Sequence, residues 1–372
     1  MNKLNVLSLV SYNFLPAKMG GQKNIALHNQ YLSTHVNLIA VSTKSNDISL
    51  VNYKVYNIVS NSFFRYINVF YFFTIRRIII EHKISHVIIE HPYYGWLAFL
   101  LQKFCKIKLI IHSHNIEAIR FKTLNKSWWK ILWFYEKWVH QIADFSLFIT
   151  EEDKFYAENN YSITENKSDI ITYGIEIDQS PSIEEKLNCS QIIRKKHQIN
   201  SDEKILLFNG TLDYLPNIIA IETIVNNINS ILIANESFKY KIIICGKNLP
   251  KELENIEHEK NIIYAGFVDD IAVYFKAADI FINPVIEGGG IKTKVVEALG
   301  YNLSVVSYKS GSLGIDINVT LNKLHIVNDA QVSDFASAVM NLDISINTPE
   351  SFYKVYNWKY IAQKTYNILK QP

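Results

Sequence analysis

Short apolar runs rich in valine and isoleucine alternate along the chain with longer segments whose apolar residues recur at helical spacing. In the first half these runs are Val6–Val10, Leu38–Val41, Val87–Ile89, Leu109–Ile111 and Phe145–Ile149. Strands that are buried on both faces of a parallel sheet form such continuous apolar runs, and each needs a crossover helix before the next. The first half is therefore predicted to be an α/β unit with a parallel sheet.

The same alternation begins again after a polar stretch, Glu176 to about Ser201, that has no clear periodicity. Further strands are expected at Ile205–Phe208, Ile242–Cys245, Ile262–Tyr264, Ile280–Ile282 and Val305–Ser307. A chain of 372 residues is too long for one hydrophobic core. We therefore predict two lobes, 1–175 and 176–348, with a hinge between Gly174 and Lys186, and a final helical segment, 349–372.

Composition excludes several classes of protein. The net charge of +3 is too small for a general nucleic-acid binder, which would carry a basic excess on one face. The three cysteines, Cys105, Cys189 and Cys245, are unpaired in spacing, which argues against a disulfide framework and a zinc site and favours a reducing, cytoplasmic compartment. The longest apolar stretch, Tyr66–Ile80, is interrupted by two arginines and is shorter than the roughly 20 residues of a membrane-spanning helix.

The strongest local signal is the segment Asn283–Gly300, with the sequence NPVIEGGGIKTKVVEALG. Glycines between a strand and a helix let the backbone approach a phosphate, and the helix N-terminus favours an anion. Lys292 and Lys294 add positive charge, and Glu297 on the helix is suited to accept two ribose hydroxyls. The segment predicts a diphosphate site. The alternative is a tight turn with solvated lysines and a glutamate that only stabilises the helix.

A second glycine turn, Gly20-Gly21, lies between the first predicted strand and the following helix. Ligands of open α/β sheets usually bind at the carboxyl ends of the strands, where this turn is expected. The Gly-x-Gly-x-x-Gly spacing is absent, which argues against a nicotinamide-dependent dehydrogenase. A lone glycine pair is also compatible with a purely structural turn.

Polar side chains crowd the carboxyl end of one buried strand, in the segment Lys108–Arg120, KLIIHSHNIEAIR. They are expected to line a cleft, because unpaired polar atoms are costly to bury in a core. His112, His114 and Glu117 could also be interpreted as metal ligands. A metal site would need a further ligand at a fixed spacing, so none is predicted.

In this order the segments resemble the retaining glycosyltransferases of the GT-B superfamily, specifically glycosyltransferase family four. The resemblance covers most of the chain: Gly20-Gly21, HSHNIEAIR, FNGTLDYLPN, ICGKNLP, the run from Tyr264 to Gly300, and the terminal helix with Trp358. It implies two Rossmann-like lobes whose parallel sheets face across a cleft. The N-terminal lobe would hold the acceptor and the C-terminal lobe the nucleotide sugar, and the last helix would return to the first lobe.

The resemblance also implies roles for individual residues. His114 would contact the transferred sugar, and Glu287 would share the catalytic role. Asn115, Glu117 and Arg120 would lie on the acceptor side. The implied donor-binding residues are Gly20, Gly21, Asn209, Gly210, Lys247, Phe267, Val268, Gly288, Gly289, Gly290, Ile291, Lys292, Lys294 and Glu297.

Two departures from the family pattern stand out. The second family glutamate falls at Gly289, whereas this chain has Glu287 two residues earlier. The arginine and lysine that commonly follow the first strand of the second lobe are missing from NGTLDYLPN, and Lys292, Lys294 and Lys247 are the candidates to replace them.

The implied activity is retaining transfer of a hexose-type sugar from a UDP- or GDP-sugar to a glycan or lipid-linked glycan, in polysaccharide or glycoconjugate synthesis. No metal or other cofactor is expected, and no paired-aspartate cluster suggests one. Phe121–His140 and Phe63–Lys83 mix aromatic and basic residues, which suits either contact with the inner face of an anionic membrane or packing in a lobe core. A nucleotide-sugar epimerase and a catalytically inactive nucleotide-sugar-binding subunit are the alternative functions.

Overall fold

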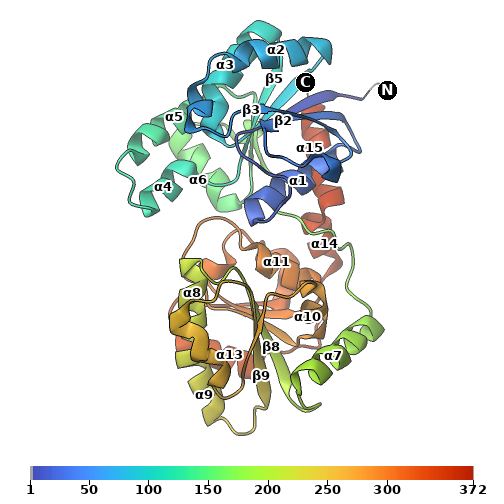
Figure 1. Cartoon of the computed structure of the whole chain (residues 1–372), viewed down its shortest axis with the longest axis vertical. Helices are drawn as coiled ribbons and strands as arrows, with labels where there is room; N and C mark the ends of the chain where they lie inside the picture. Colours follow the sequence, from blue (N-terminus) through green and yellow to red (C-terminus); the bar gives the residue numbers. More distant parts are fainter. Residues whose placement is uncertain (1–2, 372) are drawn as a thin grey trace. The chain divides into compact units, whose positions relative to one another are not determined.

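The computed structural model describes residues 3–371, which form two compact units (Figure 1). The first unit extends to Gly174 and takes in the chain again from Tyr356, whereas the second comprises Ile175–Val355. The first division falls one residue before the predicted one. The final segment, 349–372, is shared between the units, because its residues up to Val355 pack with the second.

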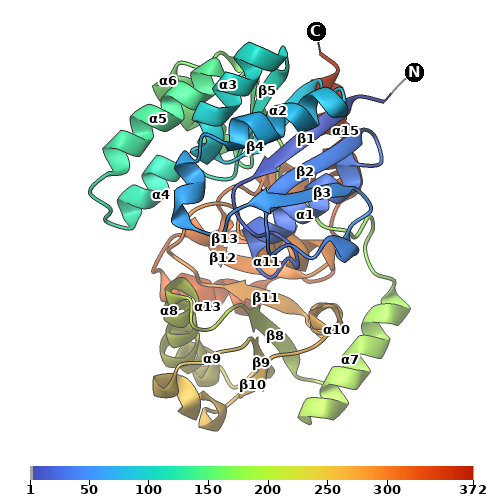
Figure 2. The ribbon, with the colours of Figure 1, turned by 45° about the horizontal axis from the view of Figure 1, so that its top comes forward.

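The first unit is built on seven parallel strands in the order β3-β2-β1-β4-β5-β6-β7, of which β1 to β5 are labelled in Figure 2. The strands are β1 (Asn5–Val10), β2 (Asn37–Thr43), β3 (Lys54–Val59), β4 (His86–Glu90), β5 (Lys108–Ser113), β6 (Phe145–Phe148) and β7 (Ser168–Ile170). The helices are α1 (Gly20–Leu32), α2 (Tyr71–Glu81), α3 (Gly95–Cys105), α4 (Glu117–Thr123), α5 (Trp129–Ile142), α6 (Glu151–Tyr161) and α15 (Trp358–Leu369). The strand order reverses between β1 and β4, which marks the usual position of a ligand.

Helices cover both faces of this sheet. Residues of α2, α3 and α5 pack in one buried cluster with Leu7 and Leu9 of β1. Asn29 of α1 instead hydrogen-bonds to Ser8, whose side chain points to the opposite face because side chains alternate along a strand. The C-terminal helix α15 packs against α1, so the last residues of the chain complete the first unit.

The second unit contains six parallel strands in the order β10-β9-β8-β11-β12-β13. The strands are β8 (Lys204–Asn209), β9 (Tyr240–Cys245), β10 (Ile262–Gly266), β11 (Ile280–Asn283), β12 (Ser304–Tyr308) and β13 (Leu324–Val327). The α-helices are α7 (Ile183–His197), α8 (Leu215–Glu222), α9 (Asn229–Ala234), α10 (Ile271–Ala277), α11 (Thr293–Gly300), α12 (Ile317–Thr320), α13 (Val332–Asn341) and α14 (Glu350–Tyr356). The order reverses here between β8 and β11.

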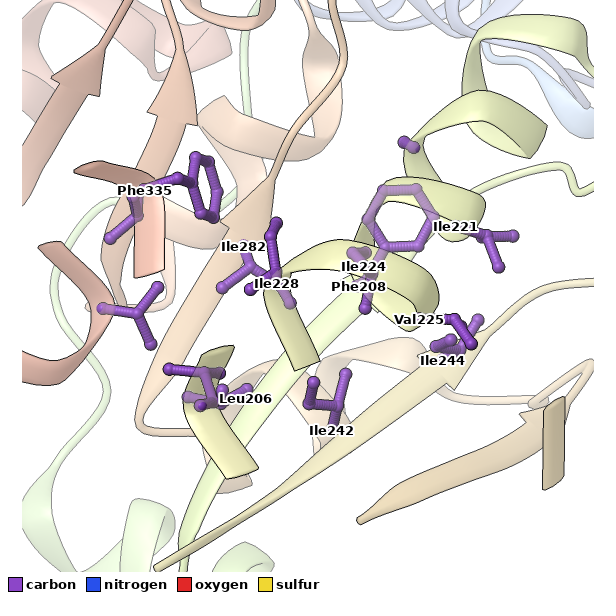
Figure 3. Close-up of a cluster of buried hydrophobic side chains, with 14 of the residues drawn as sticks. Leu206, Phe208, Ile221, Ile224, Val225, Ile228, Ile242, Ile244, Ile282 and Phe335 are labelled. Atoms are coloured by element: carbon purple, nitrogen blue, oxygen red, sulfur yellow. The ribbon is translucent and has the colours of Figure 1, made fainter. Parts of the chain in front are cut away.

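Figure 3 shows the core of this unit, in which isoleucines of the helices meet those of the strands. A π-helical turn, Thr223–Ile228, joins α8 to α9. The resulting run, Leu215–Ala234, has the length and composition that could span a membrane. Its residues Ile221, Ile224 and Ile228 are fully buried in this core, so the run serves as a core helix of the unit.

Three strands escaped the prediction, and all three lie at sheet edges. β3 and β7 flank the seven-stranded sheet, and β13 ends the six-stranded one. An edge strand has fewer neighbours to bury it, so it lacks the continuous apolar run of a central strand. β3 is largely half-buried, β7 has three residues, and the two middle residues of β13 are exposed.

Two helical predictions were also wrong in detail. The polar stretch expected between the lobes contains α7, which buries only Ile193 and is started by a capping box between Ser182 and Glu185. The final segment is two helices, α14 and α15, because Asn357 interrupts it and its side chain accepts a hydrogen bond from the Lys359 amide.

We expect Trp358→Ala to destabilise the first unit by about 3–5 kcal/mol, the usual cost of deleting a buried aromatic side chain. The indole is fully buried and lies so close to Gly174 that a Cβ there would be 2.6 Å from the ring. Urea unfolding followed by circular dichroism measures the change. Tyr360→Ala, on the same helix but 45% exposed, is the control and should alter stability by less than about 0.5 kcal/mol. Equal unfolding midpoints for both variants would contradict this role of α15.

Candidate active site

The glycine loop of the second unit connects β11 to α11 and lies beside the point where the strand order reverses. Gly288 has a φ of 93°, a conformation that side chains rarely allow, and a Cβ there would lie 3.0 Å from the Tyr214 hydroxyl. The Lys292 ammonium hydrogen-bonds to the carbonyl oxygens of Gly288 and Gly290. The loop is thus wrapped around a lysine immediately before the helix N-terminus.

Lys294 extends from the first turn of α11 to the carboxyl end of β8. Its Nζ lies 2.9 Å from Asn217 Oδ1 and 3.2 Å from the Asn209 carbonyl oxygen, and 4.2 Å from the centre of the Phe208 ring. The ammonium therefore contacts both ends of the segment NGTLDYLPN, which carries no arginine or lysine of its own. This contact joins the start of α11 to the carboxyl end of β8.

Both lysines are held in surroundings that disfavour their charge. Loss of solvent lowers the pKa of Lys292 to about 8. Loss of solvent and the neighbouring Lys292 together lower the pKa of Lys294 to about 7. Their hydrogen-bond partners are neutral carbonyl and amide oxygens. An anion placed beside them would restore the charged form.

The other predicted donor residues lie at the same sheet edge of the second unit. Gly210 follows β8 and Gly246 follows β9. The two glycines approach each other closely, because a Cβ on Gly246 would lie 2.1 Å from the Gly210 carbonyl oxygen. Lys247 and Glu287 are exposed, and Phe267 is 70% exposed just after β10. Val268, Gly289, Ile291 and Glu297 complete this group, with Glu297 on α11.

The predicted residues of the first unit form a second polar group around a buried carboxylate, Glu90, at the end of β4. Its Oε2 lies 2.9 Å from His112 Nδ1 and 2.8 Å from His114 Nε2. Burial acts to raise the pKa of Glu90, but the two histidines outweigh it and hold the pKa well below its usual value. Burial and the neighbouring His91 lower the pKa of His114 to about 3, so this imidazole is neutral.

Glu117 is the centre of a neighbouring cluster. Its carboxylate lies 2.7 Å from the Tyr93 hydroxyl, 3.0 Å from an Arg120 guanidinium nitrogen and 3.3 Å from His91 Nδ1. Burial alone would raise its pKa, but these partners lower it to about 2. Glu117 is therefore an ionised, fully engaged carboxylate, whereas Asn115 is half-buried beside it.

Four residues of this group were not predicted. Glu90, His91 and Tyr93 lie at the end of β4, where the segment EHPYY carries the same signal of polar groups after an apolar run that singled out β5. His91 has a φ of 67°, rare for a residue other than glycine and typical of functional sites. Glu136 accepts hydrogen bonds from the Glu117 and Ala118 amides, and no local sequence signal reveals this long-range cap.

The metal-ligand set considered from the sequence is not assembled. His112 and His114 both bind Glu90, whereas Glu117 pairs with His91 and Arg120. The structure instead groups His28 of α1 with Glu90 and His112.

The predicted site residues thus fall into two groups. Gly20 and Gly21, at the start of α1, lie in the first unit with His114, Asn115, Glu117 and Arg120. The remaining donor residues and Glu287 lie in the second unit.

Comparison with known protein families matches both units. The model described as Glycosyltransferase Family 4 matches residues 35–179, and the model described as Glycosyl transferases group 1 matches residues 203–343. Together they cover about three quarters of the chain. An uncharacterized glycosyltransferase of Methanocaldococcus jannaschii is 22% identical over 298 residues, which are 76% of this chain and 70% of that protein.

Solved structures share the complete fold. A glycosyltransferase from Rickettsia africae aligns with a TM-score of 0.73 at 16% identity, over 100% of this chain and 98% of its own. HepE from Anabaena, in complex with UDP and glucose, aligns with a TM-score of 0.70 at 11% identity, over 98% and 99% of the two chains. The predicted architecture of two parallel-sheet, Rossmann-like lobes is confirmed. The chain belongs to the glycosyltransferases of the GT-B fold, with a Family 4 domain in its first unit and a group 1 domain in its second.

Proposed function

We propose that this glycosyltransferase moves a hexose-type sugar from a UDP- or GDP-sugar to a glycan or lipid-linked glycan, with retention at the anomeric carbon and without a metal ion at the diphosphate. The second unit would bind the donor and the first the acceptor. The observation that carries the proposal is the Lys294 ammonium at the end of β8, beside the glycine loop and the start of α11. HepE, which shares the fold, was solved with UDP and glucose and supports a nucleotide donor.

The leaving diphosphate gains negative charge as the glycosidic bond breaks. Fixed cations and backbone amides stabilise such charge without reorganising during the reaction. Lys292 and Lys294 are held in position by hydrogen bonds, and the N-terminus of α11 adds its partial positive charge. This set replaces the arginine and lysine missing from the segment after β8 and gives the leaving group cationic partners that need no metal.

His114 is the proposed contact to the transferred sugar. Because an ionised carboxylate only accepts hydrogen bonds, Nε2 of His114 carries the proton shared with Glu90. The neutral ring then presents a lone pair on Nδ1, which is buried and has no hydrogen-bond partner within the protein. His114 would accept a hydrogen bond from a sugar hydroxyl. Glu287, exposed in the glycine loop, remains the proposed second catalytic residue.

Donor affinity should fall as the pH rises. The pKa values of Lys294 and Lys292 in the free protein are about 7 and about 8, and a bound diphosphate would raise both. Binding is therefore strongest below pH 7 and weakens through pH 7–9 by up to about ten-fold per pH unit for each lysine that titrates. Isothermal titration with UDP- and GDP-sugars at pH 6.5, 7.5 and 8.5 measures this slope.

Variants separate Lys294 from general pH effects. Lys294→Arg keeps its charge throughout this range and should flatten the slope, whereas Lys294→Met should weaken binding at pH 6.5. Lys239→Met is the control. Lys239 is exposed, lies just before β9 and pairs with Asp202, so its removal should leave the dependence of donor affinity on pH unchanged. An identical slope in Lys294→Arg would remove Lys294 from the donor site.

We expect Lys292→Ala to lower turnover by about ten-fold to a thousand-fold, the usual loss for one preorganised group that stabilises the transition state. The assay follows transfer of labelled sugar to acceptor, with circular dichroism to show that the fold is intact. Unchanged kinetics would refute the assignment. Conversion of the donor without acceptor would indicate an epimerase, and donor binding without turnover would indicate an inactive subunit.

We also propose that the protein is cytoplasmic and binds anionic membranes peripherally. Phe63, Phe64, Phe70 and Phe73 are each at least 66% exposed, in a segment that continues into the exposed Arg76 and Arg77 of α2. A cluster of aromatic and basic side chains suits the interface of an anionic bilayer.

The tryptophans of the other aromatic segment contribute less to this surface. Trp133 hydrogen-bonds to the Tyr156 hydroxyl, and Trp138 packs on Phe99. Trp128 is 44% exposed, and the other three are half-buried.

Phe63→Ser, Phe70→Ser and Phe73→Ser combined should abolish flotation with anionic vesicles, because they remove the apolar side chains that would enter the bilayer. Phe155→Ser removes an aromatic that is 70% exposed on α6 and should not change flotation. If wild-type protein stays at the bottom of the gradient with anionic vesicles, the membrane proposal fails.

A further inference from the structure

Tyr12 and His91 meet where the strand order of the first unit reverses. Tyr12 is the second residue after β1 and His91 the first after β4, and these two strands are neighbours in the sheet. The Tyr12 hydroxyl lies 3.2 Å from His91 Nε2. The other ring nitrogen of His91, Nδ1, lies 3.3 Å from Glu117 Oε1. The His91 ring therefore connects a buried carboxylate to the Tyr12 hydroxyl.

The ionised Glu117 determines which atom of each contact carries the proton. In a neutral imidazole one nitrogen is protonated and the other has a lone pair. The proton belongs on His91 Nδ1, because a lone pair there would face a carboxylate that can only accept. Nε2 is then the acceptor, so the Tyr12 hydroxyl donates to it. Burial and the negative charges of Glu90 and Glu117 raise the pKa of Tyr12, so the phenol keeps its proton.

The Tyr12 oxygen can therefore offer a ligand only a lone pair. A hydroxyl has a single proton, and here it is directed to His91. A ligand group that meets this oxygen must be a donor, such as a sugar hydroxyl, since an ether oxygen or a carboxylate would place two acceptors face to face. Tyr12 is half-buried, and a Cβ on Gly21 would lie 3.5 Å from its hydroxyl, so this oxygen lies beside the Gly20-Gly21 turn.

The backbone of His91 is strained. Its φ of 67° and ψ of 162° fall in a region that is essentially reserved for glycine. Its amide still donates to the His112 carbonyl oxygen of β5, 3.0 Å away, which holds the residue in line with the sheet. Strain of this kind is characteristic of residues whose side chains serve a ligand site.

We propose that the phenolic oxygen of Tyr12 binds a hydroxyl group of the sugar acceptor, and that His91 and Glu117 are positioning residues that set the direction of this hydrogen bond. The inference rests on the proposed function, which places the acceptor in the first unit. It adds Tyr12 as a contact and specifies the group that Tyr12 selects: a free hydroxyl, in preference to a deoxy position or a methyl ether.

The position of the His91 proton can be measured without any ligand. Nuclear magnetic resonance of the full chain with isotopically labelled histidine distinguishes protonated from bare imidazole nitrogens. His91→Gly, which suits the backbone, identifies the signals of His91, and Tyr12→Phe identifies them a second time by changing the surroundings of Nε2. We expect the proton on Nδ1 at pH 8.5. Glu117→Gln should move part of the population to Nε2, because an amide can also donate. A proton on Nε2 in the wild type overturns the proposal.

Transfer assays test the contact with the acceptor. The probes are methyl hexosides and their monodeoxy and mono-O-methyl derivatives, with UDP- and GDP-sugars as donors. Tyr12→Phe should lower kcat/KM for the parent acceptor about 2- to 12-fold, the value of one hydrogen bond, without changing donor affinity. At one acceptor position, loss of the hydroxyl should cost the wild type a similar factor and cost Tyr12→Phe little more, since both changes remove the same hydrogen bond.

His91→Gly tests the positioning role. Without the imidazole, Tyr12 is able to turn its proton toward the ligand, so the discrimination against the methyl ether at that position should fall relative to the wild type. A purely structural effect would slow both acceptors equally and leave their ratio unchanged, which would contradict the positioning role of His91.

Tyr56→Phe is the matched control and should leave transfer unchanged. The Tyr56 hydroxyl also bonds to a histidine, 2.8 Å from His82 Nε2, but this pair includes neither His91 nor Glu117. Equal costs of deoxygenation in the wild type and in Tyr12→Phe at every position, or the same loss in Tyr56→Phe, contradict the contact. Absence of transfer by the wild type to every acceptor would instead count against the proposed function, and the His91 proton would still test the direction of the hydrogen bond.

Discussion

Each unit places its polar chemistry where the order of a parallel sheet reverses, because helices cover the two faces and leave the carboxyl ends of the strands to meet a ligand. In the second unit this constraint joins the end of β8 to the start of α11 through Lys294. In the first it gathers the ends of β4 and β5 around Glu90 and Glu117. The two groups differ in the charge of their central side chains. The second unit carries poorly solvated ammonium groups, whereas the first carries carboxylates that are paired with histidine, tyrosine and arginine.

The two kinds of burial have different consequences. A buried lysine that hydrogen-bonds only to neutral oxygens has a lowered pKa. An anion that binds beside it would raise the pKa again. A carboxylate such as Glu117 has its negative charge compensated by neighbouring side chains, so it stays ionised. The second unit therefore carries lysines whose charge an anion would restore, whereas the first holds its hydrogen-bonding groups in fixed orientations.

The sequence predicted the central strands, because strands buried on both faces appear as unbroken runs such as Ile242–Cys245. It failed at β3, β7 and β13, where an edge position leaves residues partly exposed and the run is broken or short. It also missed α7, although Ser182 and Glu185 carry the spacing of a capping box; the helix buries too little apolar surface to show a periodic face.

The candidate site was predictable to the extent that its residues follow a strand directly. His114 does so, the loop glycines lie between β11 and α11, and EHPYY at the end of β4 could have been found by the same rule. The contact of Lys294 with Asn209 spans 85 residues, and the cap of α4 by Glu136 spans 19. Such contacts depend on strand order and helix packing, which local patterns do not encode.

The involvement of α15 in the first unit has a consequence for biosynthesis. Trp358, Thr365 and their neighbours are translated only after the whole second unit, yet they fill the space beside Gly174 and His28. When translation of the second unit is complete, the first unit still lacks its C-terminal helix. Loss of the last twenty or so codons would therefore damage the part of the enzyme that was made first.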